Sequence, residues 1–186
     1  TSGSPAHEGD KIVITAQPAE GYQIDKWLIG KEEMEFTPYT GKTTFECTVG
    51  TTDVLIKATF AKKSYTVTFT PEGEGENKLT ATRNGEPFTS GSLAYEDDKI
   101  VITAQPAEGY QIDKWLIGKE EIEVTPYTGQ TTFECTVGTA DVLIKATFTK
   151  KTFAVTLTKE GEGTISATGA ADLNAVPYGT ELTIVA

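Results

Sequence analysis

Few side chains in this sequence are of the types that catalysis uses. His7 is the only histidine, and the equivalent position in a second copy of the same pattern is Tyr95. Histidine is the usual residue for proton transfer near neutral pH and a common zinc ligand, so both kinds of site lack their main component. No serine lies in a nucleophile motif, and the Gly-Glu-Gly turns are too short to cradle a phosphate. We therefore expect neither a catalytic residue nor a cofactor.

Two aromatic pairs are candidates for ligand binding: Tyr22 with Trp27, and Tyr110 with Trp115. An exposed aromatic plane could stack on a sugar ring, so a glycan site is one interpretation. The favoured interpretation is a core position, because Tyr22 and Ile24 share a strand face. Trp27 would rejoin that face if a bulge near Asp25 and Lys26 added one residue. Large aromatic side chains dominate small β cores.

Three consecutive carboxylates, Glu96, Asp97 and Asp98, offer oxygen ligands of the kind that Ca²⁺ prefers. They lack the spacing with glycine that a calcium-binding loop of the EF-hand type requires. A solvated surface is the favoured interpretation, and we expect no metal site.

Cys47 and Cys135 are the only cysteines, and they occupy the same position in two copies of the repeat. Phenylalanine and valine flank each cysteine on the same strand face, which predicts two buried free thiols. A disulfide would require two modules to present inward-facing positions to each other.

Composition excludes several classes of protein. The 186 residues are 38% apolar and 23% charged, which is typical of a folded chain. A net charge of -11 opposes nucleic-acid binding, since that function needs clustered lysine and arginine. No apolar stretch reaches the ~18 residues of a membrane-spanning helix, so we expect no membrane insertion. The chain begins with threonine, and we expect it to be an excerpt of a longer protein.

The sequence repeats itself. Residues 11–62 reappear as residues 99–150, and the two copies differ at Met34/Ile122, Phe36/Val124, Lys42/Gln130, Thr52/Ala140 and Ala61/Thr149. The similarity extends outward, because residues 65–75 match residues 153–163. We predict a partial repeat at 1–62 (its later two thirds), a complete repeat at 63–150 and a partial repeat at 151–186 (its first third).

Apolar and polar residues alternate along most of a repeat, which predicts strands with one buried face. The expected strands are residues 11–16, 22–29, 44–49, 54–60, 65–70 and 78–83. Asn84-Gly85 predicts a tight hairpin. Met34/Ile122 and Phe36/Val124 stay apolar, so a short strand around 33–37 is expected to join the core. The predicted fold is all-β, with tandem antiparallel modules of about six strands each, sandwich-like or β-grasp-like.

The repeat resembles the divergent internalin-type B-repeats of bacterial surface proteins. The resemblance rests on the strand at 65–69, the glycine-rich turn at 73–75, and the strand at 99–104. It continues through Pro106, Gly109, Tyr110 and Trp115 to the strands at 132–137 and 143–148. It implies a tandem module on a secreted or cell-surface protein, without catalytic residues. The segment 76–98 is longer than is usual in the family.

Three functions follow as hypotheses. The first is a spacer or stalk of an extracellular or cell-surface protein, with a short stiff junction at residues 61–64. The second is an adhesion module that binds a host or cell-surface glycan or protein through a variable loop at 76–98. The third is an accessory domain of a larger extracellular enzyme. The partial repeats at the two ends also predict end-to-end self-association by strand addition.

Overall fold

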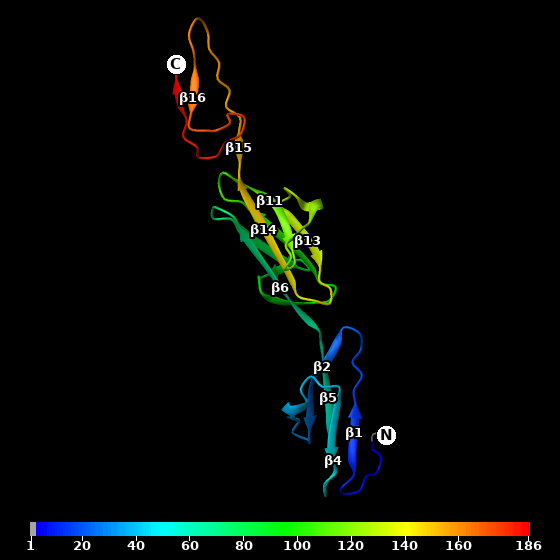
Figure 1. Cartoon of the computed structure of the whole chain (residues 1–186). Coiled ribbons are helices and arrows are strands. Elements are labelled where there is room, and N and C mark those ends of the chain that lie inside the picture. Colours follow the sequence, from blue (N-terminus) through cyan, green and yellow to red (C-terminus); the bar gives the residue numbers. More distant parts are fainter. Residues whose placement is uncertain (1–2) are drawn as a thin grey trace. The chain divides into compact units, whose positions relative to one another are not determined.

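The computed structural model describes residues 3–186, which form two compact units, Thr1–Ser64 and Tyr65–Ala186. We call them unit 1 and unit 2 and describe each by itself (Figure 1). Both units consist of strands and turns. The helical elements among the described residues are two single 3₁₀ turns, η1 (Thr37–Tyr39) and η2 (Thr125–Tyr127). The all-β prediction is confirmed.

Unit 2 contains one complete module made of two sheets (Figure 1). The first sheet has the order β12-β11-β14-β6-β9 and the second has the order β13-β10-β7-β8. The strands are β6 (Ser64–Glu72), β7 (Lys78–Arg83), β8 (Glu86–Phe88), β9 (Ser92–Tyr95), β10 (Lys99–Gln105), β11 (Tyr110–Ile117), β12 (Ile122–Glu123), β13 (Thr132–Thr136) and β14 (Val142–Lys150). The strand alternation puts apolar residues of both sheets into one continuous core. The arrangement is therefore sandwich-like.

The core of the module is closed. Its fully buried members come from strands of both sheets: Val67, Ala94, Ile100, Ile102, Trp115, Ile144 and Ala146. Asn84 and Gly85 both have positive φ, 52° and 92°, and they connect β7 to β8 in the predicted hairpin. The strand β9 was not predicted, yet its Ala94 is fully buried.

One strand pair differs from the antiparallel expectation. β14 pairs with β6 in parallel, whereas β10 pairs with β7 and β13, and β11 with β14, in antiparallel fashion. Alternation along a strand shows which face is buried but does not show the direction of its neighbour. The first and last strands of the module are therefore adjacent and run in the same direction.

The predicted bulge is present in both copies. The pairing of β2 (Tyr22–Ile29) with β5 (Ile56–Lys62) shifts register between Ile24 and Trp27. The pairing of β11 with β14 shifts between Ile112 and Lys114. The extra residue turns side chains three positions apart, Ile24 and Trp27, into the same core.

The short strand near residue 34 is present as β3 (Met34–Glu35) and β12, but its core role is only partly correct. Met34 and Ile122 are 67% and 62% exposed, because each of these two-residue strands is the edge strand of its sheet. Val124 does pack against the core of unit 2, and Phe36 packs edge-on against Phe45.

Unit 1 repeats the second part of the module with a nearly identical sequence. β1 (Lys11–Thr15) pairs with β4 (Thr44–Thr48), as β10 pairs with β13, and the sheet β3-β2-β5 matches β12-β11-β14. Residues 3–64 include no strands equivalent to β6, β7, β8 and β9. The inner face is consequently less covered: Phe60 is 46% exposed, whereas its equivalent Phe148 is 7% exposed.

Residues 151–186 repeat the first part of the module. β15 (Thr152–Phe153) pairs with β17 (Val176–Pro177), and β16 (Ser166–Thr168) pairs with β18 (Thr183–Val185). The pairing of Ala167 with Ile184 reproduces that of Ala81 with Ile102 in β7 and β10. This segment is thus equivalent to β6, β7, β9 and the start of β10.

Candidate functional site

Both tryptophan side chains lie in the cores. Trp27 and Trp115 are 1% and 0% exposed. Each indole N–H donates to a backbone carbonyl, that of Lys42 or Gln130, at 2.8 Å. Because the acceptor is the backbone, the lysine-to-glutamine difference between the copies leaves this bond intact. Neither indole has a face free for a sugar, so a stacking platform could not include it.

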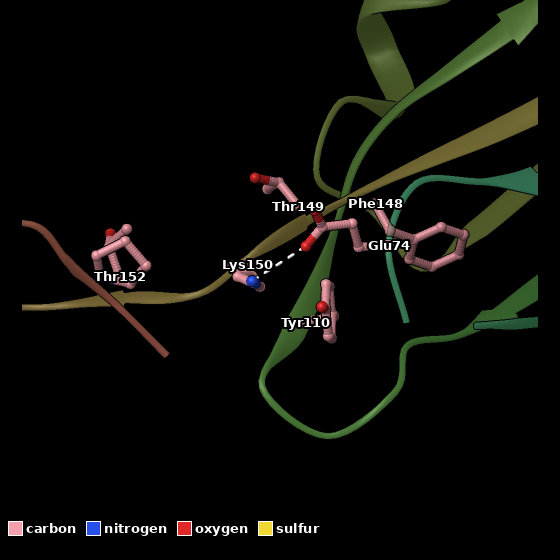
Figure 2. Close-up of a pocket in the computed structure, with 7 residues that line it drawn as sticks. Glu74, Tyr110, Phe148, Thr149, Lys150 and Thr152 are labelled. Atoms are coloured by element: carbon pink, nitrogen blue, oxygen red, sulfur yellow. Dashed lines mark ion pairs between the residues drawn. The ribbon is translucent and has the colours of Figure 1, made fainter. Parts of the chain in front are cut away.

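The two tyrosines of the aromatic pairs lie nearer the surface. Tyr22 is 37% exposed, and Tyr110 is half-buried. Tyr110 lines a shallow pocket of about 300 Å³ at one end of the complete module, together with Glu74, Phe148, Thr149, Lys150, Thr152 and Pro177. Figure 2 shows Lys150 and Glu74 joined above the Tyr110 ring.

The charges at this pocket neutralise each other. The Lys150 ammonium lies 3.0 Å from the Glu74 carboxylate. The hydrogen bond from Lys150 lowers the pKa of Glu74, and the same bond raises the pKa of Lys150. Both groups therefore stay charged at neutral pH and are unsuited to proton transfer. The pair is exposed to solvent and contributes little to stability.

Glu96, Asp97 and Asp98 lie in the turn between β9 and β10. Asp98 accepts hydrogen bonds from the Asn84 amide at 2.7 Å and from the Tyr95 backbone N–H at 2.8 Å. Asp97 has a positive φ of 69°, which is the conformation of the turn itself. The Asp98 carboxylate, engaged in this way, ties the β7–β8 turn to the β9–β10 turn.

No group of three or more histidine, cysteine, aspartate or glutamate side chains that could hold a metal ion occurs among residues 3–186. His7 is exposed, and its backbone N–H donates to Asp10 at 2.8 Å. Its imidazole also lies 3.8 Å from the Asp10 carboxylate.

Cys47 and Cys135 are free and half-buried. Burial raises the pKa of the Cys135 thiol to about 11. At neutral pH Cys135 is therefore a neutral thiol, and a nucleophilic thiolate is scarce.

The segment 76–98 is mainly strand and not a free loop. It includes β7, β8 and β9, and Leu79, Ala81 and Phe88 pack against the core. Its largest exposed apolar side chains are Leu93 (57%) and Tyr95 (41%) on β9. Most of residues 76–98 therefore belongs to the sheets of the module itself.

The junction between the complete module and the next partial repeat of unit 2 is equivalent to the junction predicted at residues 61–64, but the sequence analysis did not predict its contacts. The Lys151 backbone N–H donates to the Gly109 carbonyl at 2.8 Å, and the Tyr178 N–H donates to the Lys151 carbonyl at 2.8 Å. The Tyr178 hydroxyl also donates to Glu108 at 3.0 Å, which raises the pKa of this tyrosine.

The closest approach at this junction is between Gly109 and the Tyr178 ring. The φ of Gly109 is +76°, and a Cβ at this position would lie 1.9 Å from the Tyr178 ring. The residue must therefore be glycine for two reasons, its backbone conformation and the lack of space. The sequence signal at this place is the Gly-Tyr pair, which occurs as Gly21-Tyr22 and again as Gly109-Tyr110.

Comparison with family models matches residues 1–64 and residues 65–152 to the divergent InlB B-repeat domain. The chain belongs to the divergent InlB B-repeat family. The two matched segments are tandem B-repeats, and this family is typical of bacterial surface proteins. No curated protein and no solved structure matched the chain. Among the described residues, no helix is long and apolar enough to cross a membrane.

Three residues of the motif that characterises this B-repeat have a structural explanation. Gly109 makes room for the following repeat, Tyr110 borders the pocket, and Trp115 fills the core through the bulge. The residues that carried the resemblance therefore build the fold and the junction.

Proposed function

We propose that this chain is a non-catalytic spacer segment of a secreted or cell-surface bacterial protein, in which B-repeats set the distance between other parts. Near-identical copies support this role, since the number of repeats can change without altering any single core. The charged groups at the candidate sites also have structural partners: Asp98 accepts hydrogen bonds within its turn, and Lys150 forms an ion pair with Glu74.

The observation that carries the proposal is the junction in unit 2. A spacer must resist bending between neighbouring repeats, and a flexible linker between them would allow such bending. Here a single residue, Lys151, separates β14 from β15, and its backbone N–H and C=O are both bonded. The same backbone bond occurs in unit 1, where the Lys63 N–H donates to the Gly21 carbonyl at 2.8 Å. Each repeat thus holds the start of the connecting segment in the same way.

Small-angle X-ray scattering on chains with two to six copies of residues 63–150 tests the proposal. A stiff spacer gives a maximum dimension that grows in proportion to copy number. Freely jointed modules give a dimension that grows with roughly the square root of copy number. The matched control carries a Gly-Ser insertion after Lys63, the residue equivalent to Lys151, at every junction between copies and should shift to square-root growth. Square-root growth without the insertion would contradict the spacer.

A further inference from the structure

The parallel pair of β6 and β14 connects the two points at which the chain enters and leaves the complete module (Figure 1). The chain enters at the start of β6 and leaves at the end of β14, and the strands pair over six residues, from Val67 opposite Val142 to Glu72 opposite Thr147. Tension along the chain therefore pulls the two strands in opposite directions along their length. We propose that the β6–β14 pair is a mechanical clamp, through which the B-repeat bears tension applied along the chain.

Force can separate two hydrogen-bonded strands in two ways. Force at the same end of both strands peels them apart, and the hydrogen bonds break one after another. Force at opposite ends loads all the bonds together, and they must break within a sliding distance shorter than the ~3.3 Å between residues of a strand. Parallel first and last strands give this second geometry, which is shear. Antiparallel strands in their place would be peeled, because the start of one would lie beside the end of the other.

Both strands of the clamp lie inside their sheet. In the order β12-β11-β14-β6-β9, β11 covers the outer side of β14 and β9 covers the outer side of β6. The Val67 carbonyl accepts from the Gly91 N–H at 2.8 Å, and the Phe69 carbonyl accepts from the Ser90 hydroxyl at 2.8 Å. With a neighbour on each side, the loaded strands exchange their hydrogen bonds for bonds to water less easily than edge strands do.

The side chains of the clamp oppose sliding as well. Val67 and Phe69 of β6 and Ile144 of β14 are buried in the same core. Thr68 and Thr70 alternate with the two β6 residues and belong to the other face of the strand. A slip of β6 by one residue would place threonines at these core positions, so the register is strongly specified.

Two polar contacts cross the pair near its ends. The Thr66 backbone N–H, at the start of β6, donates to the Asp141 carboxylate at 2.7 Å. Toward the other end, the Lys145 ammonium of β14 lies 2.7 Å from the Glu72 carboxylate of β6. Both contacts must break when β6 slides along β14, so they add to the interactions that shear loads together.

The connections between repeats transmit tension directly into the clamp. A single residue, Lys63, separates β5 from β6, and a single residue, Lys151, separates β14 from β15. A long flexible linker would extend before the strands were loaded. Here the last strand of one repeat leads within one residue to the first strand of the next.

Pulling on the full chain through pairs of introduced cysteines tests the clamp. Cys47→Ser and Cys135→Ser remove the native thiols, and DNA handles are attached at two new cysteines. Lys63→Cys with Lys151→Cys loads β6 and β14 in shear. The matched control, Lys63→Cys with Ala140→Cys, applies force at the starts of both strands and peels them. The three positions that receive handles are exposed.

At the same constant force, the sheared chain should unfold at least about tenfold more slowly than the peeled chain. Each hydrogen bond that must break together with others corresponds to a roughly two- to tenfold lower rate. The rate should also rise less steeply with force in shear, because the sliding distance is short. A sheared chain that unfolds as fast as the peeled chain, or faster, would overturn the proposal.

Two valine substitutions locate the resistance within the module. Val67 and Val137 are 0% and 1% exposed in the same core, but Val137 directly follows β13, outside the clamp. If shear of the clamp limits unfolding, Val67→Ala should speed it roughly tenfold, and Val137→Ala should change it by less than about twofold. Urea unfolding without force checks that both variants are folded. Equal effects of the two substitutions under force would overturn the assignment to β6 and β14.

The clamp concerns tension and goes beyond the spacer, which concerns bending. The scattering experiment measures stiffness without load, and the pulling experiment measures the strength of one module. Freely jointed modules can still have strong clamps, and a stiff array can consist of modules that shear easily. The two proposals can therefore fail separately.

Discussion

The same phenylalanine occurs in two environments, and this permits a matched test of what the missing strands contribute. Phe148 is 7% exposed and Phe60 is 46% exposed, in segments of almost identical sequence. Truncation of a buried phenylalanine to alanine costs ~3–5 kcal/mol, so Phe148→Ala should lower the free energy of unfolding of unit 2 by that amount.

The expected cost at Phe60 follows from the difference in exposure. The difference is 39 percentage points (46 minus 7). On a phenylalanine of about 200 Å², it corresponds to about 80 Å² of surface that Phe60 leaves in water. At ~25 cal/mol per Å², this is ~2 kcal/mol. Phe60→Ala should therefore destabilise unit 1 by ~2 kcal/mol less than Phe148→Ala destabilises unit 2.

Pulsed alkylation in urea measures each unit separately, because each unit has one cysteine. The difference Lys42/Gln130 gives the two cysteines tryptic peptides of different mass, 43–57 and 120–145. The measurement is made in dilute solution. Thr149→Ala, at the exposed neighbour of Phe148, is the control and should change stability by less than ~0.5 kcal/mol. Equal costs at Phe60 and Phe148 would refute the argument that the missing strands determine the difference.

Three further predictions follow from the structure. In the same alkylation experiment, Cys47 should become labelled at a lower urea concentration than Cys135, because unit 1 buries less of the same apolar surface; equal midpoints would contradict this. Gly109→Ala should loosen the junction and make the chain more sensitive to proteolysis near Lys151, whereas Gly118→Ala, which has the same backbone strain (φ +75°) but no atom within 4 Å, should not; equal sensitivity would show that the Tyr178 contact does not hold the junction. Burial raises the pKa of Cys135 from 9.0 to about 11. In a Cys47→Ser variant, Cys135 should therefore react with a thiol reagent at pH 8 about 100-fold more slowly in the folded chain than in urea. A native rate as fast as the denatured rate would show that this thiol is not buried.

The sequence by itself determined the repeat, the strands and their buried faces. These depend on local patterns: alternation places Ile100 and Ile102 in the core, Asn84-Gly85 makes the hairpin, and one added residue lets Trp115 face inward. The family resemblance followed from the same local motifs and is confirmed by the match over residues 1–152.

The tertiary structure decided which of the residues with a strand pattern form paired strands. Val54 and Leu55 have the same identity as Val142 and Leu143, yet only the second pair is in a strand, because β6 lies beside it. The parallel direction of β6, the core position of Ala94 and the contact of Tyr178 with Gly109 likewise depend on residues distant in sequence. A strand's own residues specify which face it buries, but its neighbours determine how much of that face is removed from water.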